Sequence, residues 1–355
     1  MSTDNNPGYA SYIVKKMRQI RIPEQGVIKV EETNKPTFGP DQVLLKIKYV
    51  GFCGSDLNTF RGRNLMAKES VIPGHEIGAE IESVGTDVPC FLYPGLTVTV
   101  NPYTNCGHCA ACRSNHPNAC EFNETLGVQR DGAMRDYLAM PWQKIIPTSG
   151  ISARDCALIE PMSVGFHAVA RAEVTDSDTV LVFGCGMIGA GAIIRSSLRG
   201  ATVIAVDLDD EKLALAHRLG ATYTINSTKQ ELDTTLKELT SGYGPTVVVE
   251  AVGSVSTYQA AINEVAYSGR VVCIGYSKSE VTLRTSLFVK KEINILGSRN
   301  ATPMDFEAVI RYLKHNTCPK DELISAVVKP EAALSAMQEW SENPGSIFRI
   351  LVDFT

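Results

Sequence analysis

The chain has 355 residues, enough for two domains with large buried cores. Hydrophobic residues make up 44% of it and charged residues 21%, as in ordinary soluble globular proteins. The net charge of −5 argues against nucleic acid or an anionic membrane as a partner, and the absence of a long apolar run argues against a transmembrane helix. The first residues lack the apolar core of a signal peptide, so we expect a cytoplasmic protein.

The first part of the chain, to about residue 160, alternates short apolar runs with Gly/Pro turns. Examples are QVLLKIKYV at 42–50, EIGAEIESVG at 76–85 and GLTVTVNPY at 95–103. Short strands of this kind predict a small, partly open β-barrel.

Candidate metal ligands follow two of these strands. Cys53 lies in the Gly-rich turn GFCGS, and His75 and Glu76 follow Gly74. Taken alone, one Cys and one His are weak signals, because a buried thiol and a hydrogen-bonded core histidine are common.

The segment NCGHCAACRSNHPNAC, residues 105–120, is the four-cysteine loop. It holds Cys106, Cys109, Cys112 and Cys120. A reducing compartment disfavours disulfides, and four thiolates at this spacing favour a closed, structural zinc site. An iron–sulfur cluster and four free thiols are the alternatives. We expect the loop's histidines, His108 and His116, to be solvated.

Residues 179–221 read as strand, turn, helix, strand and helix. The turn carries Gly184, Gly186 and Gly189 in a G-x-G-x-x-G pattern, which predicts a dinucleotide site with the pyrophosphate at the helix N-terminus. The intervening Met187 and Ile188 begin that helix and belong to the same predicted site. Asp207 ends the second strand, where a carboxylate binds the ribose hydroxyls, and Leu208 follows instead of Arg. This favours NAD over NADP, although Lys212 is near in sequence.

Four more apolar runs continue the pattern, at 221–226, 246–253, 270–276 and 293–298. Strands that alternate with helices predict a parallel, doubly wound sheet. Gly253 and Gly275 close two of these strands at the edge where nicotinamide should lie; a simple turn role is the alternative. Thr302 and Pro303 predict the start of a further helix.

These motifs occur in the same order in the zinc-containing medium-chain alcohol and polyol dehydrogenases, which the chain resembles from about residue 20 to its end. The resemblance implies an α/β protein. A GroES-like catalytic domain, a partly open β-barrel, would span residues 1–160 and 299–355, and a Rossmann NAD-binding domain residues 161–298. It also implies two zinc ions per chain, one catalytic and one structural.

The resemblance implies a role for each upstream residue. Cys53 and His75 would bind the catalytic zinc, with Glu76 as a direct or movable ligand. Asp56 would orient His75, and Ser55 would relay the substrate's proton. Glu160, in the sequence LIEPMSVGFHAV, resembles the Glu-Pro form of the sorbitol and threonine dehydrogenases, in which the glutamate binds zinc directly or through water. A helix-start acid is its alternative role.

The loop LGSRNATPMDF, residues 296–306, resembles that of bacterial sugar-acid dehydrogenases such as the L-galactonate and L-gulonate 5-dehydrogenases. It contains Arg299, which could clamp a substrate carboxylate; a contact with the cofactor or a surface ion pair is the alternative. Arg61, Arg63 and Arg130 are weaker candidates for the same role. The similar stretch at 125–138 departs from that group at Gln129 and Ala133.

The sequence therefore predicts a zinc-dependent oxidoreductase that transfers a hydride from a secondary hydroxyl of a polyol or sugar acid to NAD. An L-threonine 3-dehydrogenase-like or general secondary alcohol dehydrogenase is one alternative, and a non-catalytic NAD- and zinc-binding redox sensor is another. The resemblance implies a homodimer or homotetramer.

Overall fold

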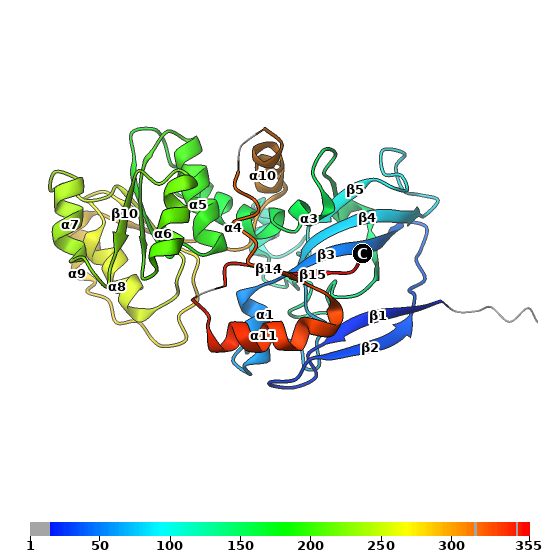
Figure 1. The fold of residues 1–355 in the computed structure, drawn as a ribbon. Coiled ribbons are helices and arrows are strands. Elements are labelled where there is room, and N and C mark those ends of the chain that lie inside the picture. The colour runs from blue at the N-terminus through cyan, green and yellow to red at the C-terminus, as the bar shows by residue number, and fades with distance from the viewer. Residues whose placement is uncertain (1–14, 316–317, 346) are drawn as a thin grey trace, which may run out of the picture.

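The computed structural model describes residues 15–315, 318–345 and 347–355. Within these ranges the chain forms a seven-stranded, largely antiparallel sheet and a six-stranded parallel sheet, joined by helices (Figure 1). None of the helices in these ranges has both the length and the apolar composition needed to cross a bilayer.

The first sheet has the order β14-β15-β3-β4-β5-β7, and β6 pairs with β3. Its strands are β3 (Gln42–Phe52), β4 (Glu76–Val84), β5 (Thr97–Val100), β6 (Tyr137–Pro141), β7 (Ile145–Pro147), β14 (Ala326–Val328) and β15 (Ile350–Asp353). A separate hairpin pairs β1 (Lys16–Arg21) with β2 (Lys29–Asn34). Because β15 pairs antiparallel with β3, the C-terminal strand, red in Figure 1, lies beside the blue strand β3.

The parallel sheet has the order β10-β9-β8-β11-β12-β13. Its strands are β8 (Thr179–Phe183), β9 (Thr202–Asp207), β10 (Tyr223–Asn226), β11 (Val247–Glu250), β12 (Arg270–Cys273) and β13 (Asn294–Gly297). All six fall within the apolar runs that the sequence indicated. The order reverses direction next to β8, and this switch point is where an open α/β sheet binds its ligand.

Helices cover both faces of this sheet, as a doubly wound arrangement requires. Val180 and Val182 of β8 face the core formed with α4 (Ile159–Arg171) and α5 (Met187–Leu198). Leu181 and Phe183 face the core formed with α7 (Leu232–Leu239) and α8 (Val255–Glu264). Side chains alternate along a strand, so a strand buried on both faces reads as an uninterrupted apolar run. The α/β fold class is thus confirmed.

The helices are α1 (Gly54–Phe60), α2 (Ala110–Arg113), α3 (Ala153–Cys156), α4 (Ile159–Arg171), α5 (Met187–Leu198), α6 (Asp210–Arg218), α7 (Leu232–Leu239), α8 (Val255–Glu264), α9 (Ser286–Lys291), α10 (Pro303–His315) and α11 (Ala333–Glu342). Short 3₁₀ turns occur at Pro117–Ala119, Trp142–Lys144 and Pro330–Ala332. Helix α10 begins at Pro303, where the sequence placed its start, because a proline in the first turn loses no intrahelical hydrogen bond.

Candidate active site and metal centres

The four-cysteine loop folds back so that its sulfur atoms converge. The four Sγ atoms all lie within 4.8 Å of one another, with 4.0 Å between Cys106 and Cys112 and 3.8 Å between Cys109 and Cys120. Backbone N–H groups of Cys106 and Cys109 donate to sulfur atoms of the same cluster. Gly107 supplies the tight turn between the first two thiols, with φ of +78°.

This arrangement fits zinc. A tetrahedral ion with four sulfurs at about 2.3 Å has sulfur–sulfur edges of about 3.8 Å, close to both distances above. The same distances are far too long for disulfides, which bond at about 2.05 Å. In the metal-free protein, backbone hydrogen bonds from Cys112 and Glu121 lower the pKa of the Cys109 thiol to about 6, whereas burial raises the pKa of the Cys112 thiol to about 11. A bound cation favours the thiolate form of both.

A second group of donors gathers where β3 ends and β4 begins. Cys53 precedes α1, His75 precedes β4, and Glu76 is the first residue of β4; their ligand atoms lie within 4.8 Å of one another. The pairing of β3 with β4 sets Gly51 opposite Glu76. A Cβ on Gly51 would lie 2.2 Å from Glu76 Oε2, so this glycine leaves the space that the carboxylate occupies.

Several polar atoms of this group are buried without a hydrogen-bond partner among the described residues. They are His75 Nδ1, both carboxylate oxygens of Glu76, Asp56 Oδ1 and Ser55 Oγ. Unsatisfied buried polar atoms are costly and rare, and a bound cation with its ligands would satisfy them. The donor set of thiolate, imidazole and carboxylate suits zinc.

Arg349 is a residue of this site that the sequence reasoning missed. It is 5% exposed, and its Nη1 lies 2.9 Å from Glu76 Oε1, an ion pair by distance although the geometry does not make a hydrogen bond. The same nitrogen donates to the Phe52 carbonyl at 2.6 Å. A charged residue directly before the apolar run ILVDF is the sequence signal that could have identified it, since buried charges are almost always paired.

The structure does not bring Glu160 into the close group of Cys53, His75 and Glu76. Glu160 lies in the first turn of α4, is 4% exposed, and accepts a hydrogen bond from the Tyr103 hydroxyl. Burial raises the pKa of its carboxyl to about 7 in the metal-free chain. A direct zinc bond from Glu160 therefore stays a prediction, and Tyr103 is a second residue that the sequence reasoning missed.

Asp56 and Ser55 lie on α1 beside the same group. Asp56 Oδ2 accepts a hydrogen bond from the Cys53 backbone N–H at 2.9 Å, and burial raises the pKa of its carboxyl to about 6. No hydrogen bond joins Asp56 to His75 in the described structure, so the expected orienting bond is not present. Asp56 instead fixes the turn that carries Cys53.

The Gly-rich turn follows β8 at the carboxyl ends of the parallel strands, which we call the cofactor edge. Gly184 has φ of +88°, and Gly186 is the N-cap residue of α5. A Cβ on Gly189 would lie 1.8 Å from the Gly184 carbonyl oxygen, whereas one on Gly186 would meet nothing within 4 Å. Gly189 thus permits close packing, while Gly186 leaves open space above the helix N-terminus. Met187 and Ile188 form the first turn of that helix.

Asp207 ends β9 beside this turn. Its Oδ2 accepts from Cys185 N at 2.7 Å, and its Oδ1 accepts from Leu208 N at 2.8 Å and Asp209 N at 3.2 Å. The carboxylate is thereby held by backbone donors next to the predicted phosphate turn. Leu208 is 68% exposed and sets no positive charge there.

Gly253 and Gly275 meet at the same edge. A Cβ on Gly275 would lie 2.3 Å from Gly253 N, and Gly253 has φ of +79°. The buried Glu250 carboxylate holds this turn, since its Oε1 accepts from Val252 N at 3.0 Å and Gly253 N at 2.8 Å. The two glycines are thus needed for close backbone contact, and their predicted place beside nicotinamide stays a prediction.

Arg299 lies in the segment between β13 and α10, beside the four-cysteine loop. Its Nη1 donates to the Cys120 carbonyl at 3.3 Å, and its own carbonyl accepts from Asn118 Nδ2 at 2.9 Å. The structure therefore ties Arg299 to the loop of the first metal cluster, and the described residues form no ion pair with it.

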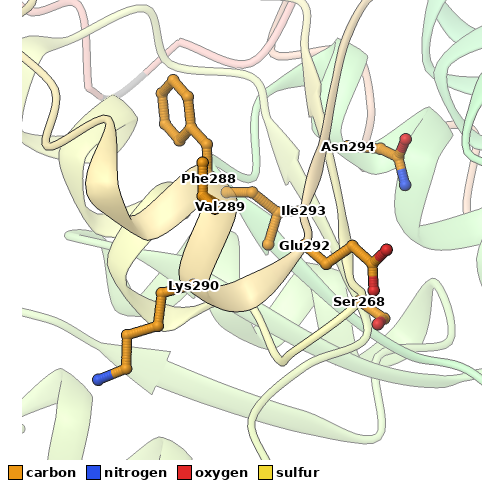
Figure 2. Close-up of a pocket in the computed structure, with 7 residues that line it drawn as sticks. All are labelled: Ser268, Phe288, Val289, Lys290, Glu292, Ile293 and Asn294. Atoms are coloured by element: carbon orange, nitrogen blue, oxygen red, sulfur yellow. The ribbon is translucent and has the colours of Figure 1, made fainter.

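A surface hollow of about 650 Å³ lies at the other end of the parallel sheet (Figure 2). It is next to the first residues of β12 and β13 and is lined by Ser268, Phe288, Val289, Lys290, Glu292, Ile293 and Asn294. Ligands of open α/β sheets bind at the carboxyl ends of the strands, so this hollow is not part of the cofactor edge.

Comparison with known proteins adds to this geometry. Residues 39–150 match the alcohol dehydrogenase GroES-like domain, and residues 188–315 match the zinc-binding dehydrogenase family. The chain is 34% identical over 304 residues to L-galactonate-5-dehydrogenase of Escherichia coli K12, covering 85% of this chain and 88% of that one. It is 35% identical over 334 residues to sorbitol dehydrogenase of Bacillus subtilis, covering 91% and 90%.

Solved structures agree with this. A crystal structure from E. coli described as an alcohol dehydrogenase complexed with NADH has a TM-score of 0.88 at 27% identity and covers 95% of this chain and 99% of that one. Galactitol-1-phosphate dehydrogenase of E. coli has a TM-score of 0.88 at 26% identity, with the same coverage. The sheet that contains β3 and β4 is thus GroES-like, and the parallel sheet is Rossmann-like.

Proposed function

The chain belongs to the zinc-containing medium-chain alcohol and polyol dehydrogenases, and on that premise we propose that it oxidises a secondary hydroxyl of a polyol or sugar acid to a ketone with NAD. The family membership makes the chain an oxidoreductase acting on secondary alcohols. The observation that carries the finer proposal is the group of Cys53, His75 and Glu76 with its unsatisfied buried atoms.

Cys53, His75 and Glu76 would hold the catalytic zinc, with Glu160 as a further or water-mediated ligand. When bound, zinc supplies the Lewis acidity that lowers the pKa of a substrate hydroxyl, and NAD supplies the hydride acceptor. The four-cysteine loop would hold a second, structural zinc, because its four thiolates leave no position open for substrate.

The chain's own residues position these groups and move the proton. Ser55 Oγ is buried without a hydrogen-bond partner in the part of the chain that the structure describes, so it would be free to accept the proton of the substrate hydroxyl and pass it outward. Asp56 holds the Cys53 turn through the backbone N–H. Arg349 offsets the buried charge of Glu76 and fixes where that carboxylate lies.

The preference for NAD over NADP rests on Asp207. Its carboxylate is fixed at the end of β9 by three backbone donors, where it would accept hydrogen bonds from the ribose hydroxyls and repel a 2′-phosphate. Gly184, Gly186 and Gly189 would let the pyrophosphate approach the N-terminus of α5. Gly253 and Gly275 would line the nicotinamide side.

A sugar acid is the substrate class that we favour. Arg299 offers a guanidinium in the segment that also starts α10, and one relative of similar sequence is an L-galactonate dehydrogenase. Sorbitol dehydrogenases of comparable similarity make neutral polyols the second candidate class.

The test is NADH formation at 340 nm by the zinc-loaded protein with aldonates, neutral polyols and L-threonine. Turnover of aldonates supports the proposal, and turnover of threonine alone favours the threonine-type alternative. A protein that binds NADH but turns over none of them would favour the redox-sensor alternative. Full activity of a metal-stripped Cys53→Ala variant would contradict the zinc mechanism, since Cys53 is a proposed ligand.

The same proposal assigns residues 1–160 and 299–355 to the catalytic domain and residues 161–298 to the NAD domain.

We also propose that the protein is a homodimer or homotetramer. In support of this assembly, β13 pairs only with β12 among the described residues, and Ile295 and Val289 beside this edge are 42% and 86% exposed. Two copies related by a two-fold axis could pair these edges. Light scattering after size-exclusion chromatography tests this; a 38.5 kDa particle would contradict it.

A further inference from the structure

A buried polar network joins the four-cysteine loop to the segment between β13 and α10. Its members come from four parts of the chain: Asn118 from the loop, His167 from α4, residues 299–302 from the segment, and Asp305 from the first turn of α10. Asn118, His167 and Asp305 are 7%, 7% and 8% exposed. These groups are so far from solvent that each depends on the others for its hydrogen bonds.

Asn118 is the centre of the network. Its Nδ2 lies 2.9 Å from the Arg299 carbonyl and 3.0 Å from His167 Nε2. In the reverse direction, the backbone carbonyl oxygen of Asn118 accepts from Asn300 Nδ2 at 2.8 Å. Together with the bond from Arg299 to the Cys120 carbonyl, these contacts fasten the end of the metal loop to two consecutive residues of the segment.

His167 and Asp305 extend the network to the start of α10. Because Asn118 donates from Nδ2 to both partners, His167 Nε2 is the acceptor and His167 Nδ1 carries the proton that goes to Asp305 Oδ2, 3.0 Å away. Asp305 Oδ2 also accepts from Thr302 N at 2.9 Å and Thr302 Oγ1 at 2.6 Å. If the Asn118 side-chain amide were flipped, its Oδ1 would face the Arg299 carbonyl oxygen, and two acceptors would repel each other.

We propose that Asn118 is a positioning residue through which the four-cysteine loop holds Arg299 in place. Asn300 has φ of +56°, so this segment is not held by regular secondary structure, and the network supplies the missing constraints. The metal loop then has a role in substrate selection as well as in stability. This last step rests on the proposed function of Arg299 as a carboxylate clamp; the positioning itself does not.

The first test measures the segment directly. In the zinc-loaded Asn118→Ala variant, peptides spanning residues 298–305 should exchange amide hydrogens on the order of tenfold faster than in the unchanged protein, because two buried hydrogen bonds are lost. Asn300→Gly removes the reverse bond and keeps the positive φ, so it serves if Asn118→Ala does not fold. Asn123→Ala is the matched control. Asn123 lies five residues after Asn118 and is similarly buried, at 8% exposed, but its side chain donates to Thr125 instead of the segment.

Unchanged exchange over 298–305 in both Asn118→Ala and Asn300→Gly would overturn the proposal, and so would an equal increase in Asn123→Ala. Metal content measured on each variant separates loss of positioning from loss of zinc. A variant that loses the metal and gains exchange throughout the loop would also contradict a specific role for Asn118.

The second test uses turnover. Asn118→Ala should raise the KM of an aldonate several-fold while the KM of NAD stays unchanged, and this effect should disappear when Arg299→Lys is already present. An equal KM increase with and without Arg299→Lys would contradict action through Arg299. If Arg299→Lys alone changes no aldonate KM, the clamp fails, whereas the exchange measurement still decides whether Asn118 positions the segment.

Discussion

Asp207 shows at the scale of one residue how charge selects a cofactor. We expect Asp207→Ser to raise the KM of NAD on the order of tenfold, because hydrogen bonds to the ribose are lost, and to improve use of NADP, because the repulsion of a 2′-phosphate is removed. The measurement is kcat/KM with each cofactor. Asp210→Asn, a change at the exposed start of α6, is the control, and an unchanged NAD-to-NADP ratio in Asp207→Ser would contradict the assignment.

Arg349 tests the energetics of the buried ion pair. Arg349→Met should destabilise the protein by about 3–5 kcal/mol, since it leaves the fully buried Glu76 carboxylate without its cation. Adding Glu76→Gln should recover part of this loss, because no charge then remains unpaired. Denaturant unfolding measures both, and Arg61→Met, whose side chain bonds Ser341 rather than an acid, should cost far less. A loss no larger than that of Arg61→Met would show that Arg349 is dispensable.

The sequence indicated the donors of this site but not their partners. Cys53, His75 and Glu76 were weak signals by residue type, and the family resemblance indicated them as metal ligands. Arg349 is separated from Phe52, whose carbonyl it binds, by 297 positions, and Tyr103 from Glu160 by 57. Such contacts depend on sheet order and helix placement, which local residue patterns do not encode.

At the scale of elements, two glycines of the Gly-rich turn have different expected roles: Gly189 allows close packing, and Gly186 leaves room for the cofactor. We expect Gly189→Ala to cost about 3 kcal/mol or more, because its Cβ would collide with a backbone oxygen of the turn that cannot move far. Gly186→Ala should leave the melting temperature nearly unchanged, because nothing lies within 4 Å, and should raise the KM of NAD. Thermal unfolding with NAD titration checks the pair. A large stability loss in Gly186→Ala, together with an unchanged melting temperature in Gly189→Ala, would contradict these roles.

The strands of the parallel sheet were predictable because they are buried on both faces and read as apolar runs between helices. The first sheet was less so. The sequence indicated its short strands, but its order, with β15 between β14 and β3, joins residues 326–353 to residues 42–52. When antiparallel strands are far apart in sequence, the local residue pattern of one strand does not indicate which other strand it pairs with.

For the whole molecule, we expect the metal-free protein to become less stable as the pH rises. Burial raises the pKa of Asp56 to about 6 and that of Glu160 to about 7. Both folded pKa values exceed the unfolded values of about 4, so the stabilisation is complete below about pH 4 and is lost progressively as the pH rises through the folded values. Glu160→Gln should flatten this dependence. Thermal unfolding of both metal-free proteins between pH 5 and 8 measures the difference.

The zinc-loaded protein should show a weaker dependence, because a bound cation favours the ionised carboxylates. A metal-free protein whose stability relative to Glu160→Gln increases from pH 5 to 8 would contradict this account of the site. Metal content must be measured at each pH, since thiolate and imidazole ligands release zinc when protonated.

By itself the sequence determined the fold class, the parallel sheet with its Gly-rich turn, and the four-cysteine loop as a metal-binding motif. Each of these follows from local spacing: strand period, turn glycines, and ligands a few residues apart. Only the tertiary structure decided that Glu160 bonds Tyr103, that Arg349 pairs with Glu76, and that Asn118 donates a hydrogen bond to the Arg299 carbonyl. Those contacts arise where distant segments pack together, and burial then requires each polar group to find whichever partner the fold has brought within reach.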